Sequence, residues 1–218
     1  MEISNYVTQT ASCATTSESA DLSYDGGTLV AYLQRVKTWL DQNPNEVLTI
    51  LFTNPDGINV MIWGADFVSS GIAGMAFVPN FTSTPPDLNS WPTLESMISS
   101  GKRVVIFMDY YANQTEVDYI LDEFTYMWET PFDQTNSSFP CTVNRPPSLE
   151  GQIPKGRMSV INHFFDIALP DDILVPDRAA LDVTNGISGP GSLGEQAIEC
   201  AQMYGAYPNF FLVDCKSP

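Results

Sequence analysis

The chain has 218 residues, among them 26 acidic residues, nine basic residues and a single histidine, and its net charge at pH 7 is -17. This charge excludes nucleic acid as a partner and disfavours docking on an anionic bilayer, because both need clustered lysine and arginine side chains. With 44% hydrophobic residues and no apolar run of about 18 residues, the composition is that of a globular α/β chain without an integral membrane span, of unknown oligomeric state.

The first part of the chain predicts a helix followed by a buried strand. Residues 1–23 are polar and rich in serine and threonine, and we expect a poorly ordered segment there, followed by one domain over residues 24–218. In residues 28–40 the apolar side chains recur every three or four positions, which places them on one helical face. The apolar run at 47–52 is typical of a strand covered on both faces, as in parallel sheets. The pair forms half of a βαβ unit.

The same arrangement returns along the chain. Helical spacing at 91–100 and at 193–204 precedes further apolar runs. Strong strand patterns lie at residues 47–52, 103–108, 158–161 and 210–213. These strands are too few to close an eight-stranded barrel, even with weak candidates at 76–78 and 173–176.

Three other segments complete the predicted organisation. Residues 58–67 predict a short helix, and residues 116–128 (EVDYILDEFTYMW) predict a clear amphipathic helix. Residues 129–155 contain several prolines and no periodicity. We expect them to form a long surface excursion, which in βα folds often overhangs the functional site.

Polar side chains follow each strong strand at its C-terminal end, where barrels and open sheets of βα units bind ligands. For one strand, the simpler interpretation is that polar residues mark a turn. Because every strong strand ends in this way, with few basic residues nearby, the pattern favours a site. The strand-end residues are Asn54, Asp56, Asp109, Tyr110, Asn162, His163 and Asp214.

Cysteines and glycosylation patterns both favour a secretory route. Cys13, Cys141, Cys200 and Cys215 lack zinc or redox spacing, so one or two disulfides are expected, with three complete pairings open. N-glycosylation patterns occur at Asn80, Asn113 and Asn136. The first residues, MEISNYVTQTASC, do not resemble a signal peptide.

Several blocks of the sequence carry a resemblance to a known family. In order and spacing, the blocks resemble fungal PLC-like phosphodiesterases, relatives of the X domain of phosphatidylinositol-specific phospholipase C, over residues 24 to 215. The blocks are VKTWLDQNPNEVLTILFTNPDG, GKRVVIFMDYYAN, ILDEFTYMWETPFD, GRMSVINHFFD, ILVPDRAA and NFFLVDC. The resemblance implies a distorted TIM-type barrel, a small phosphodiester or lipid headgroup as substrate, and an extracellular location for the full-length family member. We therefore expect an incomplete TIM-type (β/α) barrel with its first strands missing, as the C-terminal part of a larger protein or a truncated gene product.

The chain departs from the family pattern where catalysis is expected. The resemblance implies two histidines that act as general base and general acid. The only histidine here, His163, matches neither position, and Thr10-Ala11-Ser12-Cys13 stands where relatives carry His-Thr-Ser-Cys. We expect a phosphoric diester hydrolase family member that is inactive as this chain. The alternatives are a non-catalytic ligand-binding or remnant domain and, disfavoured by the resemblance, a glycosidase that uses Asp56 and Asp109.

The resemblance also suggests roles for strand-end residues. Asp214 matches the carboxylate that orients the general-base histidine. His163 would line the substrate pocket beside Asn162, or else be a packed core histidine. Asn54 and Asp56 lie where relatives place a substrate-binding lysine or a metal-binding acid, although a turn role is at least as plausible for Asn-Pro-Asp-Gly.

Three further residues are candidate substrate contacts. Asp109 stands where some bacterial relatives use arginine against the substrate phosphate. Tyr110 would stack on a sugar ring or cover the barrel rim, and Arg178 is the basic residue expected on the face that carries the site. No cofactor is expected, while a divalent cation such as calcium stays open as an alternative.

Overall fold

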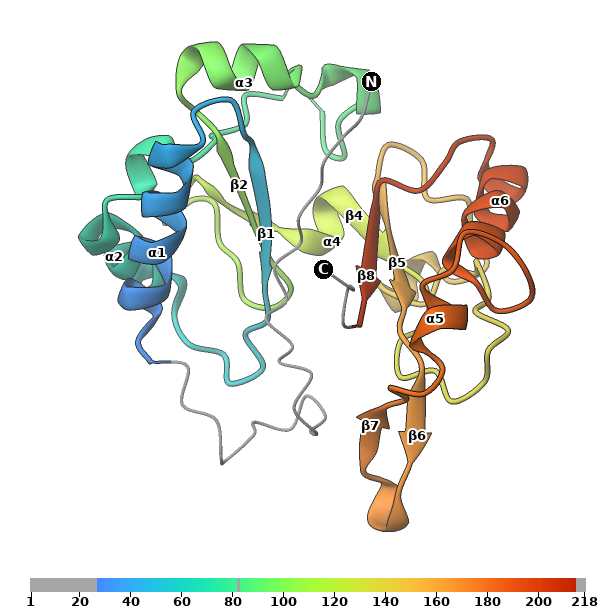
Figure 1. Ribbon diagram of the computed structural model, residues 1–218. Helices are drawn as coiled ribbons and strands as arrows, with labels where there is room; N and C mark the ends of the chain where they lie inside the picture. The colour runs from blue at the N-terminus through green and yellow to red at the C-terminus, as the bar shows by residue number, and fades with distance from the viewer. Residues whose placement is uncertain (1–26, 82, 215–218) are drawn as a thin grey trace. The chain divides into compact units, whose positions relative to one another are not determined.

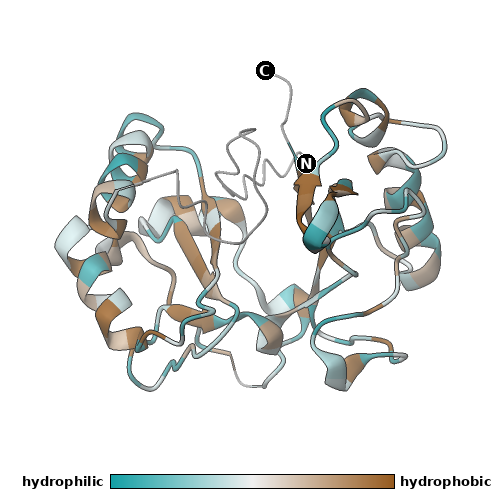
Figure 2. Cartoon of the chain, turned by 90° about the horizontal axis from the view of Figure 1, so that it is seen from below, coloured by the Kyte–Doolittle hydropathy of each residue, from teal (hydrophilic) through white to brown (hydrophobic). Residues whose placement is uncertain are grey.

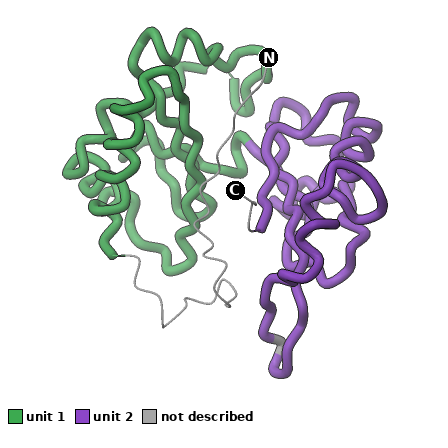
Figure 3. The backbone as a smooth tube through the Cα atoms, viewed as in Figure 1, with its two compact units in different colours: residues 1–8, 25–126 green, residues 9–24, 127–218 purple. Residues whose placement is uncertain are grey.

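The structure, a computed structural model, describes residues 27–214 with the exception of Thr82. These residues group into two compact units, 27–126 and 127–214 (Figure 3). Each unit contains helices and one three-stranded parallel sheet. The sequence was interpreted as one domain over 24–218, and that assignment stays a prediction.

The first unit is built on β1 (Leu48–Phe52), β2 (Val104–Met108) and β3 (Ile120–Asp122), which pair in this order (Figure 1). Leu48 pairs with Val104, and Ile106 pairs with Ile120. The helices are α1 (Leu29–Gln42), α2 (Val60–Ser70), α3 (Leu94–Ser100) and α4 (Glu123–Tyr126), with short turns η1 (Ala73–Met75) and η2 (Leu88–Ser90). All five residues of β2 are buried, as expected for a central parallel strand.

Helix α1 shows how local chemistry sets the boundaries in this unit. Thr28 caps its N-terminus, since the Thr28 hydroxyl oxygen accepts the Ala31 N–H at 3.2 Å. At the other end, the buried guanidinium of Arg103 donates to the carbonyl oxygens of Leu40, Asn43 and Glu46, each at 3.0 Å. The Leu40 and Asn43 carbonyls also accept the backbone N–H groups of Asn43 and Glu46, each at 3.2 Å, so the guanidinium is a second donor to them. Arg103 therefore joins the end of α1 to the start of β2.

The second unit is built on β4 (Met127–Glu129), β5 (Met158–His163) and β8 (Phe210–Val213), which also pair in this order and in parallel. Its helices are α5 (Leu181–Thr184) and α6 (Leu193–Tyr204), with turns η3 (Pro147–Leu149) and η4 (Pro170–Asp172). After β5, the antiparallel hairpin of β6 (Asp166–Ala168) and β7 (Leu174–Pro176) extends away from the rest of this unit (Figure 1). Figure 2 shows the strands as the more hydrophobic parts of the chain.

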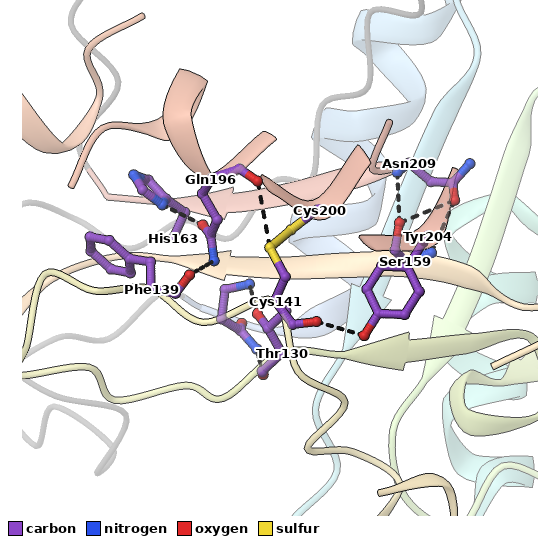
Figure 4. Close-up of a disulfide and its surroundings, with 10 residues drawn as sticks. Thr130, Phe139, Cys141, Ser159, His163, Gln196, Cys200, Tyr204 and Asn209 are labelled. Carbon is purple, nitrogen blue, oxygen red and sulfur yellow. Dashed lines mark hydrogen bonds between the residues drawn. A yellow bond between two sulfur atoms is a disulfide. The ribbon is translucent and has the colours of Figure 1, made fainter. Parts of the chain in front are cut away.

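A disulfide between Cys141 and Cys200 joins the segment after β4 to helix α6 (Figure 4). Both cysteines are buried in a small core with Trp128, and the Tyr204 hydroxyl donates to the Cys141 carbonyl oxygen at 2.6 Å. The bridge closes a loop across 59 positions, and such loops stabilise folded domains by about 2–4 kcal/mol. The expectation of at least one disulfide is confirmed, while Cys13 and Cys215 lie outside the described residues.

Most predicted elements are confirmed, with boundaries shifted by one to a few residues. The main error is the amphipathic helix at 116–128, where the structure has β3, the single turn α4 and then β4. Residues 129–155 are not only a surface excursion, because Phe139, Cys141 and Val143 are buried. The weak strand at 173–176 exists as β7, but in the antiparallel hairpin, and residues 76–78 contribute one isolated bridge from Ala76 to Val104.

The predicted α/β class with parallel sheets is confirmed. In each sheet the spatial order of strands follows the chain order, as in consecutive βα units. The described residues show no closed barrel. None of their helices has the length and apolar character needed to cross a membrane.

Candidate functional site

In the first unit, Asn54 and Asp109 meet at the C-terminal ends of β1 and β2. Both are buried, and one Asp109 carboxylate oxygen accepts the backbone N–H groups of Asn54 at 2.8 Å and Tyr110 at 2.7 Å. The Asn54 amide donates to the carbonyl oxygens of Ile58 at 2.9 Å and Tyr110 at 3.2 Å, and its oxygen accepts the Ile58 N–H. The turn role considered for Asn54 is therefore present. These contacts leave its amide little capacity to bind a ligand.

The other strand-end candidates of this unit are on the surface. Asp56 is exposed, and the Tyr110 ring is 41% exposed with its centroid 6.3 Å from that of Phe124. Asp56 and Asp109 thus differ in environment, one in solvent and one bound to backbone N–H groups. No described contact joins them as a carboxylate pair.

In the second unit, Glu129, Arg145 and Asn162 converge at the ends of β4 and β5. One buried carboxylate oxygen of Glu129 accepts from Arg145 Nε at 2.9 Å, from Arg145 Nη2 at 2.5 Å and from the Asn162 amide at 3.0 Å. Asn162 also donates to the Thr130 carbonyl oxygen at 2.8 Å. The Arg145 guanidinium lies 4.4 Å from the centroid of the Phe132 ring, and its side chain is 23% exposed. The cluster places a partly accessible cation at a strand end.

His163 ends β5 as a packed histidine. Its side chain is fully buried, and Nδ1 lies 2.5 Å from the Gln196 amide oxygen (Figure 4). Nε2 lies 2.7 Å from the Thr184 carbonyl oxygen. Its ring centroid is 4.1 Å from that of Phe139. Burial lowers the pKa of His163, and the bonds to Thr184 and Gln196 oppose that shift. The imidazole therefore has both nitrogens engaged with protein oxygens and no access to a substrate.

Asp214 follows β8, and one oxygen of its carboxyl group lacks a hydrogen-bond partner among the described residues. This oxygen, Oδ2, is buried, and burial raises the pKa of Asp214 to about 6. Asn185 donates to the Asp214 backbone oxygen at 3.0 Å, and the Asn185 amide oxygen is itself buried without a partner in this part of the chain. Arg178, by contrast, is exposed after β7.

Sequence reasoning missed Glu129 and Arg145. Glu129 ends β4, a strand hidden within the predicted helix at 116–128, and Arg145 lies in the segment predicted to be a surface excursion. A strand assignment for the apolar pair Met127-Trp128 would have identified Glu129 as a strand-end residue.

The described residues contain no group of three or more histidine, cysteine, aspartate or glutamate side chains placed to hold a metal ion.

Comparison with known proteins relates the whole chain to one family. The family model described as PI-PLC X 1 matches residues 7–217. An "Uncharacterized secreted protein" of Arthroderma benhamiae is 44% identical over 199 residues, which cover 90% of this chain and 44% of the relative. "PI-PLC X domain-containing protein 1" of the same organism is 40% identical over 192 residues, which cover 87% of this chain and 61% of the relative. The chain thus spans about half the length of these relatives, and no solved structure matches it significantly.

Proposed function

The chain belongs to the PI-PLC X domain family, and from this we infer that it is a phospholipase C-like phosphodiesterase domain which binds a phosphodiester headgroup but does not cleave it as this chain. The absence of cleavage is inferred from the environment of His163, the only histidine among 218 residues. A general acid or base must lie within hydrogen-bond reach of the proton that it transfers. His163 is buried, and both of its ring nitrogens face protein oxygens.

Binding is supported by Arg145. A guanidinium matches the geometry of phosphate oxygens and can bind them through two parallel hydrogen bonds. Arg145 lies at the end of β4, where βα folds place their ligands, and keeps part of its side chain accessible while Glu129 and Phe132 hold its orientation. A phosphodiester would share this cation with Glu129.

Asp214 supports an incomplete acid–base system. A carboxyl group with a buried oxygen that lacks a partner among the described residues is suited to accept a hydrogen bond from a catalytic imidazole. In the family pattern this position orients the general base, yet the only imidazole of the chain is committed elsewhere.

Two wider features belong to the same proposal. The chain order of the strands in both sheets supports a distorted (β/α) barrel. Secretion is supported by the disulfide and by the description of one relative as a secreted protein.

The first test is hydrolysis of a chromogenic phosphodiester, p-nitrophenyl phosphorylcholine, by the purified 218-residue chain. We expect no release of p-nitrophenol above the buffer rate, because no available imidazole can exchange the protons. Turnover by the wild-type chain that disappears in His163→Ala would contradict the proposal.

The binding half is tested by titrating glycerophosphoinositol, a soluble phosphodiester, into the chain in a calorimeter. Arg145→Gln should weaken binding about tenfold or more, because it removes the cation, and Arg145→Lys should weaken it less. Arg178→Gln, a change of the same kind at an exposed position, serves as the matched control and should bind like wild type. If neither the wild-type chain nor any variant gives a binding heat, the result would favour the remnant-domain alternative.

A further inference from the structure

Two of the glycosylation patterns lie wholly within the described residues. Asn113-Gln114-Thr115 follows the end of β2, and Asn136-Ser137-Ser138 lies in the segment that leads to Cys141. The third pattern, at Asn80, includes Thr82, which the structure does not describe. The side chains of Asn113 and Asn136 are both exposed.

The Asn113 pattern is folded into a turn by its own atoms. The Asn113 amide oxygen accepts the Thr115 hydroxyl at 2.7 Å and the Thr115 backbone N–H at 3.1 Å. The Asn113 backbone carbonyl accepts the N–H groups of Glu116 and Val117, each at 3.0 Å. The Asn113 amide nitrogen has no hydrogen-bond partner among the described residues, so the atom that would carry a sugar is directed at no protein group.

Asn136 has the same division of roles. Its amide oxygen accepts the Ser138 N–H at 3.0 Å, and its amide nitrogen has no partner in the described part of the chain. The buried asparagines differ, since the amide nitrogens of Asn54 and Asn162 both donate to backbone carbonyl oxygens. A bulky group on either of those nitrogens would disrupt a strand end, whereas on Asn113 or Asn136 it would project into water.

We propose that Asn113 and Asn136 carry N-linked glycans. In the reaction, the amide nitrogen displaces the pyrophosphate from the first sugar of a lipid-pyrophosphate oligosaccharide. An N–C bond forms, the sugar C–O bond breaks, and the amide loses one proton while the lipid pyrophosphate leaves. The Cys141–Cys200 disulfide supports this inference independently, because disulfides persist in the oxidising compartments of the secretory route. This proposal does not depend on phosphodiester binding.

The position of Asn113 gives its glycan a specific place. Asn113 follows Asp109 and Tyr110, the residues that end β2. Asn113 lies in the segment that links β2 to β3, where its glycan would add a hydrated polar layer to the surface of the first unit.

The test is secretion of the full chain, fused to a secretory leader, from a eukaryotic host, followed by enzymatic removal of N-glycans and peptide mapping. The enzyme converts each glycosylated asparagine to aspartate, so we expect aspartate at positions 113 and 136. Asn113→Gln and Asn136→Gln should each lose one glycan by intact mass, and the double variant should lose both. Unmodified asparagine at both positions in the secreted wild-type chain overturns the proposal.

A second pair of variants keeps the test valid where a glutamine variant fails to be secreted. Thr115→Ser preserves the acceptor pattern and should keep the Asn113 glycan. Thr115→Val removes only the hydroxyl and should lose it. Equal occupancy of position 113 in these two variants also overturns the assignment.

Discussion

Asp214 shows at the scale of one residue how burial couples protonation to folding. Burial raises the pKa of its carboxyl group to about 6, against about 3.9 for an aspartate in an unfolded chain. The folded state therefore binds the proton more tightly than the unfolded state. The resulting stabilisation is complete below about pH 4 and is lost as the pH rises through about 6.

Asp214→Asn should remove this dependence, because asparagine has nearly the same size and no charge. At pH 7 we expect the free energy of unfolding to rise by about 1–2 kcal/mol, a value that is discounted because the carboxyl group is only partly buried. At pH 4 the variant and wild type should be equally stable. Urea denaturation between pH 4 and pH 8 measures both, and parallel pH profiles for the two proteins would refute this account.

The sequence predicted where candidate residues lie more successfully than what they do. Asn54, Asp109 and Asn162 all end strands as expected, but each is committed to backbone groups that come from another segment. Such partners depend on strand pairing, which one-dimensional spacing does not reveal. Glu129 and Arg145 were missed for the same reason, since their contact follows from the antiparallel bridge that pairs these two residues.

At the scale of elements, Arg103 is the main link between α1 and β2. Its guanidinium donates to the carbonyl oxygens of Leu40 in α1 and of Asn43 and Glu46 in the turn that follows. The positive charge also interacts favourably with the negative end of the helix dipole.

Arg103→Ala should lower the free energy of unfolding by about 2–3 kcal/mol, because it removes three hydrogen bonds made by a buried, charged donor. Arg103→Lys keeps the charge but not the planar fork, so its loss should be smaller. Guanidinium chloride denaturation gives both values. Arg35→Ala is the control, because Arg35 lies on α1 and its side chain is exposed. A loss below about 0.5 kcal/mol in Arg103→Ala would show that water satisfies these carbonyls.

The error at residues 116–128 also belongs to this scale. The apolar residues of this stretch fit helical spacing, yet Ile120 and Leu121 pair with β2, and Met127 and Trp128 pair with β5. Only one helical turn, α4, remains between the two strands. Tertiary pairing therefore overrides the local periodicity, as is common for short apolar segments.

At the scale of the whole molecule, the sequence predicted α/β structure with parallel sheets, which the structure confirms. The longer apolar runs identified β1, β2, β5 and β8, while the three-residue strands β3 and β4 were too short to produce a pattern. The grouping into two compact units depends on contacts between distant segments, which residue spacing does not encode.

Several of the few basic side chains are engaged within the protein, which affects its electrostatic interaction with charged surfaces. Four of the described cations are held by protein oxygens: Lys37 by Asp41, Lys102 by the Gly74 carbonyl, Arg103 by α1 and Arg145 by Glu129. With a net charge of -17, the field around the molecule repels anions at distances beyond direct contact.

Sedimentation with lipid vesicles tests this repulsion. At about 0.05 M salt, phosphatidylserine vesicles should retain less protein than phosphatidylcholine vesicles, and the difference should vanish at about 0.5 M salt, where the field is screened. Capture on phosphatidylserine at low salt would contradict the expectation. The rate at which an anionic headgroup associates with this protein should therefore rise with ionic strength. A soluble headgroup should also associate faster than one presented on an acidic bilayer.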